Sequence, residues 1–244
     1  MDATIRVAEL GPSRGASWIG QSWRLFRAAP LAWLGLCGGW LAVSFALLLI
    51  PFIGGVLANF LQPVFFASFA IAAYRQAAGE RLVMGDLFGG FRRNMRALVN
   101  LGALMLLAEI AIFALMGLAG LPIARAGDET FTFSEYAEAL KDKEWILLAG
   151  FLLTVLVKGA VWFAPQLIAF HGMDTMQAIR WSVYAAISNL GALLVYGLAL
   201  LALFVASLLP MPWVVGLVIV IPLTVISTYV GYHEVFEAPP ATAQ

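Results

Sequence analysis

The sequence has few of the groups on which soluble proteins depend. Charged residues make up only 11% of its 244 positions, and Cys37 is the single cysteine. Soluble domains are about one quarter charged and about half apolar, whereas this chain is 62% hydrophobic with a mean hydropathy of +0.92. One cysteine permits neither an internal disulfide nor a thiolate metal cluster. These shortages exclude a soluble globular protein and a disulfide scaffold.

An excess of charge of one sign is also lacking. Lysine and arginine number 14 together, as do aspartate and glutamate, so no basic surplus exists to neutralise a phosphate backbone. We therefore expect no nucleic-acid partner. The motifs HExxH and GxSxG and the Walker loop are absent, and His171 and His233 make only a weak metal-ligand pattern. We expect no metal and no cofactor, and we rank a non-enzymatic role above an enzymatic one.

The chain does have six apolar runs long enough to cross a membrane. A spanning helix needs about 20 apolar residues to cross about 30 Å of hydrocarbon. Continuous apolar runs favour helices over barrel strands, which alternate lipid-facing and lumen-facing positions. The sequence predicts an all-α, polytopic membrane protein with one integral-membrane domain over residues 1–244. The predicted spans cover residues 31–50, 52–74, 97–120, 145–163, 190–209 and 213–232.

The predicted spans form three hairpins, each preceded by an amphipathic segment. Tight turns at 51–55 and 210–212 join the first and third pairs, and an acidic outer loop over 121–144 joins the second. The lead-in segments place apolar side chains at helical spacing opposite arginine, which predicts helices lying in the membrane interface. The alternative is that each segment begins a spanning helix within the aromatic belt. The three lead-in segments cover residues 17–29, 84–96 and 173–188.

The chain also aligns loosely with itself as three repeats, one for each hairpin. Each repeat has an aligned glycine early in its first span and a proline in its second span, which membrane helices tolerate when neighbours satisfy the freed carbonyl. Arg24 and Arg180 lie at the same distance before the aligned glycines of the first and third repeats. The glycines are Gly35, Gly102 and Gly191, and the prolines are Pro63, Pro165 and Pro222.

Arginine gathers in alternate connections, which sets the expected orientation. It is frequent before the first span and between the second and third, whereas the 121–144 loop is acidic. We therefore expect a multi-pass protein of the bacterial inner membrane with both termini in the cytoplasm. Six arginines in these connections are candidate contacts for anionic lipid headgroups. They are Arg24, Arg27, Arg92, Arg93, Arg96 and Arg180.

Two ionisable residues lie well inside predicted spans, Glu109 in the third and Lys158 in the fourth. An intramembrane charge is a functional hypothesis by default, and we expect the two to pair across antiparallel helices. The alternative is that Lys158 extends to the cytoplasmic headgroups while Glu109 is protonated within the bundle. Asn59 and Gln62 share one face of the second span and need internal partners. These four residues are the candidate polar cluster or substrate-binding site.

Several short motifs carry a resemblance to a known family. The chain resembles an uncharacterised family of proteobacterial inner-membrane proteins, and its organisation is more distantly similar to the membrane domain of some glycerophosphodiester phosphodiesterases. No phosphodiesterase residue is carried over, so the resemblance implies location and topology, not chemistry. The motifs are Ser13-Arg14-Gly15, Trp18-Ile19, Leu25-Phe26-Arg27, Pro30-Leu31-Ala32-Trp33-Leu34, Leu87-Phe88 and Gly90-Phe91.

The sequence leaves three classes of function open. The first is a small transporter or a lipid-interacting membrane scaffold, because repeat-built bundles with polar groups at the midplane are typical of transporters. The second is an intramembrane lipid-modifying enzyme that uses Glu109, or the pair of His171 and Asp174, as acid or base. The third is a subunit of a larger membrane complex, and a homo-oligomer is also open. Membrane lipids are the expected partners.

Overall fold

The computed structural model of the protein describes residues 5–122, 133–208 and 213–236. Every regular element in these ranges is helical, and six helices are long and apolar enough to cross a membrane, which confirms the all-α, six-span prediction. The spans are α2 (Pro30–Leu48), α3 (Gly54–Ala77), α4 (Met95–Leu118), α6 (Glu144–Ala160) with α7 (Ala164–His171), α9 (Leu190–Leu208) and α10 (Trp213–Phe236). The other elements are α1 (Ser13–Ala28), η1 (Met84–Arg92), α5 (Phe133–Leu140) and α8 (Thr175–Ser188).

The helices follow the predicted spans but extend past several of their ends. α4 begins at Met95, so Arg96 lies in its first turn and not in a lead-in segment. α10 continues to Phe236, so Glu234 belongs to its last turn. The predicted 121–144 loop contains the short helix α5. The remainder of that loop at 123–132, the turn at 210–212 and the tail after Phe236 lie outside the described residues.

The second lead-in segment is a 3₁₀ helix, shorter than the predicted 84–96 helix. Glycine is about 1 kcal/mol less favourable than alanine in an α-helix, and η1 contains three glycines. One of them, Gly90, lies so close to α3 that a Cβ atom there would come within 2.2 Å of the Val64 carbonyl oxygen. The Gly90 N–H donates to Ser68 Oγ at 2.8 Å. Close contact with α3 therefore accounts for glycine at this position.

The fourth span is interrupted near its proline. α6 ends at Ala160 and α7 begins at Ala164, whereas α3 and α10 continue through Pro63 and Pro222. Pro165 lies in the first turn of α7, where a backbone N–H has no partner within the helix. The preceding Phe163 N–H donates to Ser182 Oγ of α8 at 3.1 Å. With the interruption included, the span reaches His171, eight residues past the predicted end at 163.

The core is built from the parts of α3, α7 and α10 that follow the three repeat-related prolines. Buried residues dominate 63–73 in α3, 164–169 in α7 and most of 220–235 in α10. In the spanning windows, 56% of α3 and 72% of α10 are buried, against 17–22% of the other four spans. Phe170 of α7 stacks on Tyr232 of α10 and contacts Tyr74 of α3. The apolar remainder of each hairpin is left to face lipid.

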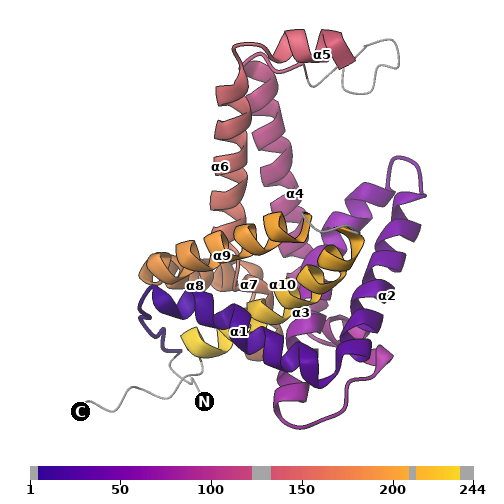
Figure 1. The fold of residues 1–244 in the computed structure, drawn as a ribbon, viewed down its shortest axis with the longest axis vertical. Coiled ribbons are helices and arrows are strands. Elements are labelled where there is room, and N and C mark those ends of the chain that lie inside the picture. Colours follow the sequence, from indigo (N-terminus) through magenta and orange to yellow (C-terminus); the bar gives the residue numbers. More distant parts are fainter. Residues whose placement is uncertain (1–4, 123–132, 209–212, 237–244) are drawn as a thin grey trace.

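Each lead-in segment packs mainly against the hairpin of the preceding repeat. η1 lies against α3, α8 lies against α7 and α6, and α1 lies against α9 and α10. Because α1 precedes α2 but packs on α9 and α10, it closes the three predicted hairpins into a ring. Figure 1 shows α1, in indigo, beside the orange α9 and the yellow α10. Helices α4 and α6 extend side by side away from these three helices.

The apolar face of α1 is occupied by the protein itself. Its buried residues include Trp18, Ser22 and Phe26, which lie on one side of the helix toward α9 and α10. Its outward side carries Arg24 and Arg27, both exposed. The amphipathic pattern that predicts an interfacial helix is therefore also the pattern that packs α1 on the third hairpin.

Candidate functional site

Glu109 and Lys158 face each other between α4 and α6, the antiparallel helices of the second hairpin. Lys158 Nζ donates to Glu109 Oε1 at 2.6 Å, so the two form the ion pair that the pairing hypothesis requires. The alternative, with the lysine directed to the headgroups, does not describe this structure. Pairing offsets much of the free-energy cost of placing either charge in hydrocarbon.

The surroundings of this ion pair are mostly apolar. The side chains of Lys158 and Glu109 are 36% and 25% exposed. The small hollow beside them has essentially no volume that a water molecule could enter. The other residues that line it are Met105, Ile112, Thr154 and Val157. The pair is thus a contact between two helices, bordered by the lipid-facing surface, and not the wall of a hydrated cavity.

The other two members of the predicted polar cluster lie on α3. Asn59 Nδ2 donates to the Gly55 carbonyl oxygen at 3.0 Å, a bond within its own helix. Gln62 is half-buried on the same helix. No hydrogen bond in the described ranges joins either side chain to Glu109 or Lys158. The structure therefore pairs the two charged residues with each other, and within the described ranges no hydrogen bond extends this pair to Asn59 or Gln62.

Gln166 is the amide that the structure places in the core. It is fully buried at the start of α7. With the amide oriented to suit its neighbours, Nε2 donates to the carbonyl oxygens of Trp162 and Phe163, and Oε1 accepts from Thr228 Oγ1, each at 3.2 Å. These bonds satisfy carbonyls at the interruption of the fourth span. Gln166 therefore has a structural role at the break between α6 and α7.

The six arginines predicted to contact headgroups are all exposed. None of them makes an ion pair or a side-chain hydrogen bond with another described residue. One of them, Arg27, lies over the ring of Trp23, with 5.7 Å between its guanidinium carbon and the ring centroid. Arg24 and Arg27 lie on α1, Arg92 and Arg93 at the end of η1, Arg96 in the first turn of α4, and Arg180 in α8. The six are Arg24, Arg27, Arg92, Arg93, Arg96 and Arg180.

Sequence reasoning missed a highly connected carboxylate, Glu234 on α10. Its side chain is 10% exposed and accepts hydrogen bonds from three residues of α1. Arg14 donates at 2.6 and 3.1 Å, Trp18 Nε1 donates at 3.0 Å, and Gln21 donates as well. Arg14, Trp18 and Gln21 are spaced four and three residues apart, so they share one face of α1. This spacing is the sequence pattern that indicates a common partner for the three donors. Glu234 holds α1 on the third hairpin.

Hydrogen bonds also hold the other two lead-in segments, η1 and α8, against the helices on which they pack. Buried Asp86 of η1 accepts from Arg75 of α3 and, at 2.8 Å, from the Val83 N–H. Thr175 Oγ1, in the first turn of α8, donates to the Ala97 carbonyl oxygen of α4 at 2.9 Å. Each lead-in segment is therefore fixed to the preceding hairpin by hydrogen bonds as well as by apolar packing.

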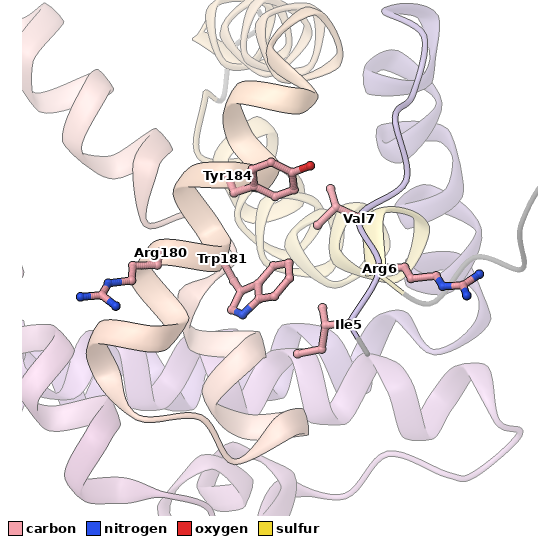
Figure 2. Close-up of a pocket in the computed structure, with 6 residues that line it drawn as sticks. All are labelled: Ile5, Arg6, Val7, Arg180, Trp181 and Tyr184. Carbon is pink, nitrogen blue, oxygen red and sulfur yellow. The ribbon is translucent and has the colours of Figure 1, made fainter. Parts of the chain in front are cut away.

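Two surface hollows lie beside arginines of the lead-in helices. We call them the α8 hollow and the α1 hollow, with volumes of about 600 and 460 Å³. The α8 hollow, drawn in Figure 2, is lined by Ile5, Arg6, Val7, Arg180, Trp181 and Tyr184. The α1 hollow is lined by Gln21, Arg24, Leu25, Ala77, Tyr229, Val230 and His233. Among the described residues, no three histidine, cysteine, aspartate or glutamate side chains are grouped as metal ligands.

Six apolar helices define a multi-pass integral membrane protein. The chain is 30% identical over 215 residues to a protein of Burkholderia thailandensis named a probable inner membrane protein, and the match covers 82% of this chain and 76% of that relative. The chain therefore belongs to the family of this inner membrane protein. No protein-family model matches the chain, and no solved structure matches it significantly.

Proposed function

We propose that this protein is a lipid-interacting scaffold of the inner membrane, which binds anionic phospholipid headgroups at the cytoplasmic leaflet. One observation carries the proposal: six exposed guanidinium groups, without ion pairs to described residues, lie on the lead-in segments and at the start of α4. Each basic group near an anionic leaflet contributes about 1 kcal/mol of attraction. No enzymatic step is part of this proposal.

The proposed orientation follows from the same arginines. Basic residues are retained on the cytoplasmic side, so the base formed by α1, η1 and α8 faces the cytoplasm together with both termini. The turn of the first hairpin and helix α5 then lie on the periplasmic side. Anionic lipids of the cytoplasmic leaflet then lie against this base, beside its exposed arginines.

The proposal is tested with the full chain in lipid nanodiscs. A ligand that binds only the folded state raises the unfolding temperature. We expect phosphatidylglycerol, compared with phosphatidylcholine, to raise the Tm of the wild type, and high salt to reduce the difference. Replacing all six arginines by glutamine is expected to remove it, whereas Lys141→Gln, just after α5, is expected to leave it unchanged. A lipid preference that survives the six substitutions contradicts the proposal.

A transport role is the second candidate, and the Glu109–Lys158 pair within the second hairpin is the observation that favours it. The hollow beside this pair has no room for water, so it supports helix packing better than a solute path. Transport therefore ranks below lipid binding. The likeness to the membrane domain of glycerophosphodiester phosphodiesterases, and roles as an enzyme or as a subunit of a complex, stay expectations from the sequence.

A further inference from the structure

We propose that the α1 hollow and the α8 hollow are two discrete binding sites for the phosphodiester headgroups of anionic phospholipids, with Arg24 and Arg180 as the respective anion ligands. The inference rests on the proposed function and deepens it, because it states where the lipids bind and how many. The chain then holds two specific lipids, although it has three repeats.

The two arginines occupy equivalent positions in their repeats. Arg24 lies 11 residues before Gly35, and Arg180 lies 11 residues before Gly191. The next residue also lines the same hollow in each case, Leu25 in the first and Trp181 in the third. Two copies of one sequence position therefore form corresponding parts of two separate hollows.

The second repeat has no such site. The residue 11 positions before Gly102 is Phe91, which is apolar. Its ring packs edge-on against Phe65 of α3, with 5.5 Å between the centroids, and it also contacts Phe88. The equivalent position is therefore used for packing η1 on the first hairpin, and we expect two lipid sites per chain.

The α8 hollow is bounded by side chains of α8 on one side and of the N-terminal segment on the other. Figure 2 shows Trp181 and Tyr184 extending from α8 toward Ile5 and Val7, while the side chains of Arg6 and Arg180 extend outward in opposite directions. Both guanidinium groups are exposed, without ion pairs to described residues, so no described contact prevents a rotation that would bring them to a bound anion.

The segment that follows the N-terminal wall of this hollow is held by hydrogen bonds. Asn189, at the junction of α8 and α9, accepts from the Leu10 N–H at 2.8 Å and donates to the Ala8 carbonyl oxygen at 2.9 Å. The Ala8 N–H in turn donates to the Val235 carbonyl oxygen of α10 at 2.8 Å. These bonds fix the chain directly after Val7, the last N-terminal residue that lines the hollow.

The α1 hollow keeps its positive charge. Arg24 lines it together with His233 of α10, and the neighbouring carboxylate, Glu234, is already bonded to Arg14. The charge of Arg24 is therefore not neutralised from within the described chain. Tyr229 and Val230 supply an aromatic and an apolar surface beside it.

This combination of groups selects a lipid over a soluble anion. A guanidinium group donates paired hydrogen bonds to phosphate oxygens, and tyrosine and tryptophan favour the headgroup level of a bilayer. Both hollows have sizes within the range of about 300–1,000 Å³ typical of small-molecule sites. Their apolar walls, with Trp181 and Ile5 in one and Leu25 and Val230 in the other, suit the glycerol backbone and the first acyl carbons. A free phosphate ion gains nothing from such walls.

Native mass spectrometry of the detergent-solubilised full chain with phosphatidylglycerol tests the inference. We expect the wild type to retain two lipids, Arg24→Gln and Arg180→Gln to retain one each, and the double variant to retain none. Lys141→Gln is the matched control and is expected to retain two. Both arginines are exposed, so circular dichroism of the variants is expected to match that of the wild type.

Three outcomes overturn the two-site inference while the proposed function stands. They are two retained lipids in the double variant, displacement of the lipid by glycerol 3-phosphate, and a loss after Arg92→Gln/Arg93→Gln equal to that after Arg24→Gln/Arg180→Gln. The last result indicates a diffuse basic surface. A wild type that binds phosphatidylglycerol and phosphatidylcholine equally overturns both proposals.

Discussion

Gly15 of α1 lies against the backbone of Ala192 of α9, so close that a Cβ atom on Gly15 would come within 1.9 Å of the Ala192 carbonyl oxygen. This contact joins the first lead-in helix to the third hairpin, between residues far apart in the sequence. Only glycine allows two helices to approach in this way. The ring is closed at this contact between α1 and α9.

Gly15→Ala is expected to destabilise the protein. The added methyl group must push α1 away from α9, and such overpacking costs about 1–3 kcal/mol. The measurement is the unfolding temperature in detergent. Gly20→Ala is the matched control, because Gly20 lies on the same helix and a methyl group there would meet nothing within 4 Å. That variant is expected to be neutral or stabilised, since alanine favours helix. Equal stability of the two variants contradicts the proposed role of Gly15.

Glu234→Gln is expected to loosen α1 from α10. The amide removes the negative charge and points an N–H₂ group at a site where every observed partner is a donor, namely Arg14, Trp18 and Gln21. Loss of charged hydrogen bonds in a mostly buried site costs about 1.5–3 kcal/mol, seen as a lower Tm. The exposed Glu9→Gln is the control. If Arg14→Gln alone lowers the Tm as much, the ion pair and not the buried Trp18 bond provides the stability.

Much of the fold could be predicted because lipid imposes a simple rule on the spans. Backbone groups must be satisfied within the helix, so length and continuous apolarity predict most helix limits to within a few residues. The break between α6 and α7 could not be placed, because Pro63 and Pro222 are accommodated within continuous helices while Pro165 is not. The difference depends on tertiary partners such as Ser182.

The site was less predictable, because its contacts join distant repeats. The Glu109–Lys158 pair could be proposed from depth in adjacent antiparallel spans, a local relationship. The contacts of Glu234 could not be predicted, because its partners are about 220 positions earlier in the chain. No sequence periodicity indicates that α1 packs on the third hairpin. The same limit applies to Asn59 and Gln62, which share no hydrogen bond with the Glu109–Lys158 pair among the described residues.

Lys158→Met is expected to destabilise the second hairpin. The substitution leaves Glu109 without its cation, and an unpaired charge at a helix centre in the membrane costs about 2.5–3.5 kcal/mol. The double variant Glu109→Gln/Lys158→Met is expected to recover most of the loss, since it removes both charges. Unfolding in a detergent series measures both effects. Lys141→Met is the control, because Lys141 and Glu138 are 3.8 Å apart and largely exposed. A stable Lys158→Met variant shows that the pair contributes little.

Cysteine labelling tests both the hairpin arrangement and the orientation. In a Cys37→Ala background, we expect a membrane-impermeant maleimide to label Phe52→Cys and Glu138→Cys in intact spheroplasts, because the first hairpin turn and α5 then face the periplasm. Glu9→Cys and Met176→Cys, at the base, are expected to react only after permeabilisation, since arginine-rich connections stay in the cytoplasm. Complete reversal of this pattern contradicts the orientation alone. Labelling of positions 52 and 138 from opposite sides contradicts the hairpins themselves, because antiparallel spans of similar length place both positions at the same membrane face.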